Sequence, residues 1–122
     1  MRFMLLCHDD ERYWQKAGQA ALSTAMQEAV KLTHEMDAKG QYLLAAPLEP
    51  AATATTVRVR DGKRSVTDGP FAETREVLGG FYLIDVDSVD EAIEIASRHP
   101  GAKVGSVEIR AVVELPGLPP RK

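Results

Sequence analysis

The stretch GGFYLIDVDSVDEAIEIASRHPG, residues 79–101, joins a strand signal directly to a helix signal. In residues 79–86, Phe81 and Leu83 point to one side and Tyr82, Ile84 and Val86 to the other, so a strand formed there is apolar on both faces. Ser88 and Glu91 match the S-x-x-E capping box, which predicts that a helix begins at Ser88. Pro100-Gly101 ends that helix.

A strand, a long helix and a second strand precede this stretch. Residues 2–8, RFMLLCH, form a strand that is also apolar on both faces, and Asp9 or Asp10 starts one helical turn after it. From residue 20 the apolar positions recur at spacings of three and four, which predicts an amphipathic helix. Its end signals are a Thr24–Gln27 capping box and Gly40. The strand QYLLAAP, residues 41–47, follows it.

Residues 56–66, TVRVRDGKRSV, contain the clearest hairpin signal, because Asp61-Gly62 suits a two-residue type I′ turn. With that turn, Arg60 lies opposite Lys63 and Val57 lies opposite Val66. One face of the hairpin then carries a basic stripe of Arg58, Arg60 and Lys63. We interpret this stripe as a solvated face with acidic neighbours.

The order β-α-β-(hairpin)-β-α-β predicts an α+β, ferredoxin-like split βαβ sandwich with an inserted β-hairpin. Residues 104–113 form its last strand, residues 1–114 a single domain, and residues 115–122 a flexible proline-rich tail. In this arrangement the first and third main strands lie in the middle of the sheet, and both helices cover one face.

Because the two middle strands are apolar on both faces, at least five apolar side chains lie on or near the uncovered face of the sheet. We count Met4, Leu6, Tyr82, Ile84 and Val86, whichever set of each strand proves to face outward. Since a buried large aliphatic side chain contributes roughly 1.5–3 kcal/mol, leaving five in water forgoes on the order of 10 kcal/mol. We therefore expect a homodimer, packed sheet against sheet. The alternative is that the hairpin or the tail covers the sheet of its own subunit.

The charge, hydrophobicity and cysteine content of the chain argue against several classes of protein. Fifteen basic and eighteen acidic residues give a net charge of −3, which argues against a general nucleic-acid binder. No apolar run approaches the ~18 residues of a membrane span. The single Cys7 excludes an intrachain disulfide, reads as a small core residue and fits a cytoplasmic protein.

The tetrapeptide DGPF, residues 68–71, is the candidate functional loop. Pro70 has no N–H, so Asp68 cannot form the usual hydrogen bond of a turn aspartate and must bind elsewhere. Two interpretations stay open. In one, the loop is a rigid turn with Phe71 in the core; in the other, Asp68 and Phe71 form a pocket wall.

The pocket interpretation assigns a role to each candidate residue. Asp68 is the acid–base group, His8 an auxiliary base, and Phe71, Arg75 and Glu73 contact the ligand. His8, Asp9 and Asp10 are adjacent, and adjacent residues rarely converge on one ion, so we predict no metal site and no cofactor. Tyr13 and Trp14 read as packing residues, and His99 as a positive charge at a helix end.

The chain resembles the DGPF-domain branch of the YCII-related proteins in three segments. These are FMLLCHDDE, ATATTVRVRDGK and VTDGPFAETREVLGGFYLIDVDSVDEAIEIASRHP. The resemblance covers residues 1 to 113. It implies a dimeric α/β barrel of ferredoxin-like protomers, a largely unassigned biochemical function, and, for some members, association with extracytoplasmic-function sigma factors. The histidine–aspartate pair of the core branch would fall near Thr24 and Ala38, so that pair is absent.

Two functions are compatible with these observations. The first is a pocket, bordered by the DGPF loop and the end of the first strand, that binds or transforms a small polar ligand. The second is a non-enzymatic module that associates with a sigma factor. The residues leave open whether a reaction is catalysed and which ligand is bound.

Overall fold

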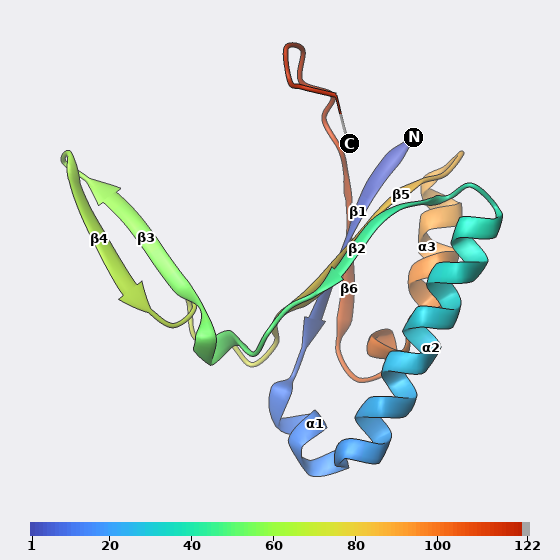
Figure 1. Cartoon of the computed structure of the whole chain (residues 1–122), viewed down its shortest axis with the longest axis horizontal. Helices are drawn as coiled ribbons and strands as arrows, with labels where there is room; N and C mark the ends of the chain where they lie inside the picture. The colour runs from blue at the N-terminus through green and yellow to red at the C-terminus, as the bar shows by residue number, and fades with distance from the viewer. Residues whose placement is uncertain (121–122) are drawn as a thin grey trace.

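The computed structural model describes residues 1–120, which form an α+β fold with a four-stranded antiparallel sheet, three α-helices and a separate β-hairpin (Figure 1). The strands of the sheet, in spatial order, are β2 (Tyr42–Pro47), β5 (Val77–Asp85), β1 (Arg2–Asp9) and β6 (Ser106–Ala111). The predicted tail, residues 115–122, ends outside this range, since residues 121–122 are not among the described residues.

The first and third main strands, β1 and β5, form the middle of the sheet, and this prediction is confirmed. They pair antiparallel, with Met4 opposite Leu83 and Leu5 opposite Tyr82. The pairing shifts by one residue after Cys7, because Gly80 lies opposite Cys7 and Leu78 lies opposite His8. Gly79 is therefore the extra residue of a β-bulge, a device that redirects the chain at the end of a ladder.

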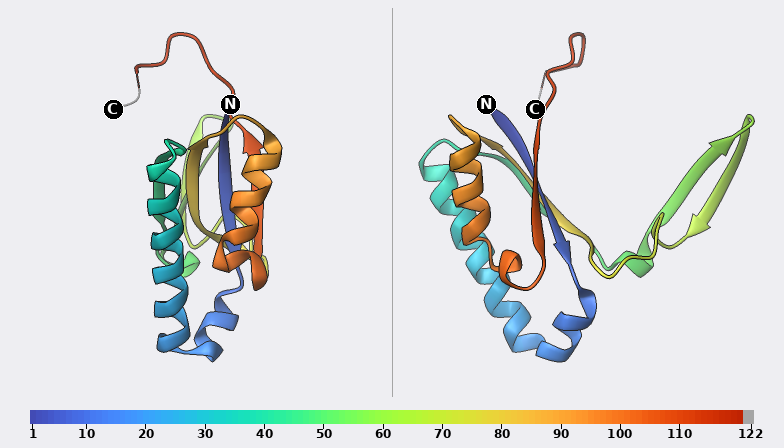
Figure 2. Two further views of the ribbon diagram at one scale, coloured as in Figure 1. Left: turned by 90° about the vertical axis from the view of Figure 1, so that its right-hand side faces the viewer. Right: turned by 180° about the vertical axis from the view of Figure 1, so that it is seen from behind.

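Two helices cover one face of the sheet, as Figure 2 shows. The helical segments are α1 (Glu11–Ala17), α2 (Gln19–Ala38) and α3 (Val89–Arg98), with short 3₁₀ turns η1 (Ala51–Thr53) and η2 (Pro100–Lys103). The core under α2 and α3 contains, among others, Phe3, Leu5, Leu32, Met36, Ile84 and Ile95. None of the helices within residues 1–120 is both long and apolar enough to cross a membrane.

The open face of the sheet carries a different apolar set from the predicted one. Tyr82, Ile84 and Val86 are buried in the core cluster, so their placement on the open face was wrong. The register places on the open face instead Met4, Leu6, Leu44, Phe81 and Leu83. The error arose because alternation divides a strand into two faces without indicating which face the helices cover. Five apolar side chains still lie on the open face.

The helix ends follow local capping chemistry, with one exception. Asp10 caps α1 by accepting a hydrogen bond from Arg12 N at 3.1 Å. The predicted stop at Gly40 is confirmed by its φ of +71°. The helical period that begins near residue 20 is confirmed, because Gly18, with a φ of +93°, turns the chain directly out of α1 and α2 begins at Gln19. The predicted Thr24–Gln27 capping box is wrong, because both residues lie inside α2.

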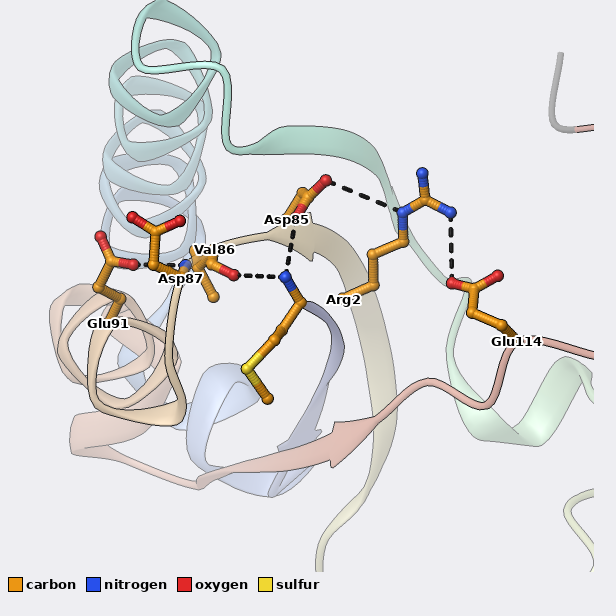
Figure 3. Close-up of polar contacts among 7 residues, drawn as sticks. Arg2, Asp85, Val86, Asp87, Glu91 and Glu114 are labelled. Carbon is orange, nitrogen blue, oxygen red and sulfur yellow. Dashed lines mark hydrogen bonds and ion pairs between the residues drawn. The ribbon is translucent and has the colours of Figure 1, made fainter.

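The capping box of α3 forms as predicted: the Ser88 hydroxyl accepts a hydrogen bond from Glu91 N at 3.3 Å. Close by, the ends of the middle strands are tied together by polar contacts (Figure 3). The Met1 amine donates to the Val86 carbonyl at 2.7 Å, and Arg2 lies within 3.9 Å of Asp85. These contacts fix the register at one end of the β1–β5 ladder, opposite the bulge.

The hairpin consists of β3 (Thr55–Arg60) and β4 (Lys63–Asp68). Asp61 and Gly62 have φ values of +53° and +75°, as a type I′ turn requires, and the predicted pairs Arg60–Lys63 and Val57–Val66 are present. The hairpin projects on the side of the sheet opposite the helices (Figures 1 and 2). Within residues 1–120, neither the hairpin nor the C-terminal segment covers the open face of its own chain.

The helix α3 offers a matched test of the core. Ile95→Ala removes a side chain that is 2% exposed, so we expect a loss of about 2–5 kcal/mol in the free energy of unfolding, measured by urea denaturation. Ile93→Ala, at a position 49% exposed on the same helix, should change it by less than about 0.5 kcal/mol. Equal losses for the two variants would contradict the placement of α3.

Candidate functional site

A cavity of about 440 Å³ lies between α2 and the sheet, and we call it the α2 cavity. Its helical wall consists of Leu22, Ala25, Met26, Ala29, Val30 and Thr33. Its floor and far end include Cys7, Asp9, Trp14, Tyr42, Gly79, Gly80, Tyr82, His99 and Gly101. The walls are mostly carbon, and the polar groups gather where β1 ends.

The cavity exists because small residues face each other across it. In the C-terminal half of α2, Leu32 and Met36 are fully packed against the sheet. Nearer the start of α2 the inward positions include Ala25 and Ala29, whose side chains are too short to fill the same space. The β5 strand contributes Gly79 and Gly80 without side chains. The C-terminal half of α2 is thus packed against the sheet, whereas its N-terminal half borders the cavity.

Asp9, the last residue of β1, supplies a carboxyl group to the cavity. Burial raises the pKa of this carboxyl, the charges of Glu11 and Glu76 raise it further, and a hydrogen bond from Trp14 Nε1 at 3.5 Å lowers it. A Cβ atom at position 79 would overlap the Asp9 carboxylate, so the bulge residue must be glycine for Asp9 to lie there. The position of the Asp9 carboxyl group therefore depends on the glycine in the bulge.

His99, at the end of α3, is the second titratable group in the cavity wall. Its Nδ1 accepts a hydrogen bond from Gly101 N at 3.0 Å, so the neutral ring carries its proton on Nε2. Burial lowers the pKa of His99, and its ring packs edge-on against Tyr82 with centroids 5.4 Å apart. The prediction of a positive charge here was wrong, because burial and an N–H donor both favour the neutral ring.

Gly101 separates the two titratable groups. A Cβ atom at this position would lie 3.0 Å from His99 Nδ1 and 3.6 Å from Asp9 Oδ1. Only a glycine leaves the space between ring and carboxylate open. The carboxyl and the imidazole therefore face a shared region of the cavity, with no intervening side chain from η2.

Two other polar groups in the wall are inert. Burial raises the pKa of Cys7 to about 12, which keeps it a thiol, in agreement with its interpretation as a core residue. Burial likewise raises the pKa of Tyr82 to about 12, which keeps its hydroxyl protonated. The chemistry that the cavity supports is therefore proton exchange and hydrogen bonding by Asp9 and His99.

No group of three or more histidine, cysteine or carboxylate side chains within residues 1–120 is arranged to hold a metal ion. Trp14, predicted to be a packing residue, lies in the wall and touches the acid, so it also contacts the cavity.

The residues predicted from the DGPF loop lie elsewhere. None of Asp68, Phe71, Glu73, Arg75 and His8 lines the α2 cavity. Phe71 is 79% exposed, so the interpretation that it plugs the core is wrong. The loop instead anchors the base of the hairpin: Gly69, with a φ of +105°, donates to Ala54 O at 2.7 Å, and Phe71 O accepts from Arg58 Nη2 at 3.0 Å.

Two of these predicted residues already have acidic partners. Arg75 Nε lies 3.1 Å from Asp10 Oδ2, and His8 Nε2 lies 2.9 Å from Glu108 Oε1. The Asp68 carboxylate is exposed at the end of β4 and has no hydrogen-bond partner within residues 1–120. A pocket between Asp68 and His8 stays a prediction.

Comparison with known proteins identifies relatives over almost the whole chain. Residues 1–116 match the sequence model of the YCII-related domain. A relative from Rhizobium meliloti (strain 1021), "Uncharacterized protein R00369", is 36% identical over 112 residues, which cover 90% of each chain. These similarities span both the sheet and the residues of the α2 cavity, and they name no ligand.

The neighbouring carboxyls Asp9 and Asp10 should respond oppositely to loss of charge. Because the pKa of Asp9 is raised in the folded state, the folded chain binds its proton more tightly, and stability falls as pH rises through that pKa. Asp9→Asn should therefore raise the free energy of unfolding at pH 7, and the gain should vanish below the unfolded pKa of about 3.9.

Asp10→Asn is the control for this measurement. The ion pair with Arg75 and the helix cap lower the pKa of Asp10, so its charge stabilises the fold above the unfolded pKa. The variant should lower the free energy of unfolding at pH 7, with the deficit shrinking as pH falls. Urea denaturation between pH 3.5 and 7 compares both variants, and a destabilised Asp9→Asn at pH 7 would contradict the assignment.

Proposed function

The chain belongs to the YCII-related domain family, and we propose that it binds a compact small molecule in the α2 cavity. The volume of about 440 Å³ falls within the range of roughly 300–1,000 Å³ typical of ligand pockets. Such pockets combine apolar walls with a few polar groups that orient the ligand. The α2 cavity has this composition.

The observation that carries the proposal is the Asp9 carboxyl. It lies partly buried in a mainly carbon-lined cavity, it forms no ion pair with a lysine or arginine within residues 1–120, and it is there only because Gly79 makes room for it. A carboxyl in such a place lowers stability unless something binds it. Groups with perturbed pKa values in a cavity are typical of functional sites.

The arrangement favours a particular ligand chemistry. An apolar body, about the size of one or two rings, fits between Ala29 and the sheet. A hydroxyl, amine or carbonyl group at one end would meet Asp9, the Trp14 indole and the neutral His99 ring. With a ligand that carries an acidic proton, Asp9 would accept that proton while a hydrogen bond from His99 Nε2 stabilises the charge that forms.

We also propose that two copies pack sheet against sheet, as in the dimeric α/β barrel that the resemblance implies. The apolar side chains of the open face support this. Leu44 is 50% exposed and Met4, Leu6 and Phe81 are partly exposed, so a second copy would bury their remaining apolar surface, whereas Leu83 is already buried in the single chain. No segment within residues 1–120 covers them in the single chain. A self-complementary face of this kind is typical of two-fold dimers.

Cavity binding can be measured with the neutral aromatic probe N-phenyl-1-naphthylamine. We expect saturable binding, seen as an increase in probe fluorescence and quenching of Trp14, the single tryptophan. Ala29→Phe places a ring in the cavity and should weaken binding at least about tenfold, which corresponds to 1.4 kcal/mol. Ala21→Phe, on an exposed position of the same helix, is the control. Equal binding by both variants would contradict the site.

The dimer can be tested at the open face. Light scattering at micromolar concentration should report twice the 13.3 kDa chain mass. Leu6→Lys, opposite Glu108 in the register, should give a monomer with an unchanged far-UV spectrum, because the new charge can pair within the sheet but cannot be buried. Ile93→Lys, on the helical side, should stay dimeric. A wild-type monomer would exclude the sheet-to-sheet dimer.

A further inference from the structure

The hairpin β3–β4, residues 55–68, is the one element pair of the described chain that forms its own sheet, and we call it the arm. It pairs with no strand of the main sheet and packs extensively on no helix. It extends well away from the body, on the side of the open face (Figure 1). A two-stranded hairpin that stands alone in water is marginally stable at best.

One face of the arm carries three unburied valines, beside Arg64 and Asp68. The register places Val57 opposite Val66, with Val59 on the same face. These three valines are 58%, 56% and 59% exposed, respectively. β-branched side chains favour strands because they pack on a half-buried surface, and here that surface lacks its second layer. The valine face therefore needs a cover that this chain does not provide.

The base of the arm holds it in a defined direction. Thr56 Oγ1 donates to Gly69 O at 2.8 Å, Gly69 N donates to Ala54 O at 2.7 Å, and Arg58 Nη2 donates to Phe71 O at 3.0 Å. A hairpin held in this way presents its valine face at a fixed position. Preorganisation of this kind reduces the entropy that association costs.

The charges of the arm also favour its contact with a second copy of the chain. The arm carries four cations, Arg58, Arg60, Lys63 and Arg64, against two acids, Asp61 and Asp68. The whole chain has a net charge of −3, so the remainder is more acidic still. None of the four cations forms an ion pair within residues 1–120, which corrects the interpretation of the basic stripe as paired with neighbouring acids. A basic arm and an acidic body attract each other between two copies.

We propose that the arm of each protomer packs its valine face on the body of a second copy, in a reciprocal exchange across the two-fold axis. This rests on the homodimer proposed above and assigns the arm a role in it. The open faces form the centre of the contact, and the arms extend it around each partner. The DGPF loop, which fixes the arm at its base, thereby sets the direction of the exchange.

The test compares the two faces of the arm in the full-length chain. The triple variant Val57→Thr, Val59→Thr and Val66→Thr keeps β-branched side chains but removes apolar surface. We expect its dimer dissociation constant, from sedimentation velocity over a dilution series, to rise at least about tenfold, or 1.4 kcal/mol. Ser65→Thr, on the other face, should leave it within about twofold.

Thiol labelling provides a second readout. Cys7 is buried, so Val59→Cys and Ser65→Cys each add a single accessible thiol. In the dimer, the thiol at position 59 should react with a maleimide at least about tenfold more slowly than the thiol at position 65, and on dilution to monomer the two rates should converge.

Each other outcome overturns a defined part of the proposal. A dimer that the triple variant does not weaken, with equal reactivity at positions 59 and 65, would exclude the arm exchange and leave the sheet-to-sheet dimer intact. A wild-type monomer would exclude both. A monomer in which position 59 is protected would show that the arm packs on its own chain.

Discussion

The β-bulge at Gly79 is the constraint on which the candidate site depends. By adding one residue to β5 opposite the end of β1, it shifts the pairing by one residue and lets the Asp9 carboxylate occupy space that any Cβ would fill. Before the bulge, the pairing of Leu5 with Tyr82 and of Met4 with Leu83 divides the two strands into a face under the helices and an open face. The pairing of β1 with β5 therefore determines which side chains form the core, which lie on the open face, and where the Asp9 carboxyl group lies.

The sequence predicted what local chemistry determines. Ser88 and Glu91 cap α3, Gly40 ends α2, and Asp61-Gly62 sets the hairpin register, because each signal acts over four residues or fewer. Prediction failed where the outcome depends on packing. The capping box at Thr24 competes with the turn at Gly18, and which face of β5 is buried depends on where α3 lies.

The α2 cavity could not be predicted, because its residues come from segments far apart in the chain. Asp9, Gly79 and His99 become neighbours only through the bulge and the η2 turn. One local signal was available: a carboxylate directly after an apolar strand, with two glycines at the start of another. The DGPF motif is stiff, and its observed contacts anchor the hairpin: Gly69 N donates to Ala54 O, and the Arg58 side chain donates to Phe71 O.

The self-contained register of the β3–β4 hairpin has a consequence for how such chains diversify. Because its pairing is set by its own turn and touches no other strand, residues can be inserted or lost in opposing pairs along it without shifting the alignment of β1, β5 and β6. The α2 cavity is lined by residues of other elements, among them Ala25, Ala29 and the glycines of β5. The length of the hairpin and the shape of the cavity can thus change independently of each other during evolution.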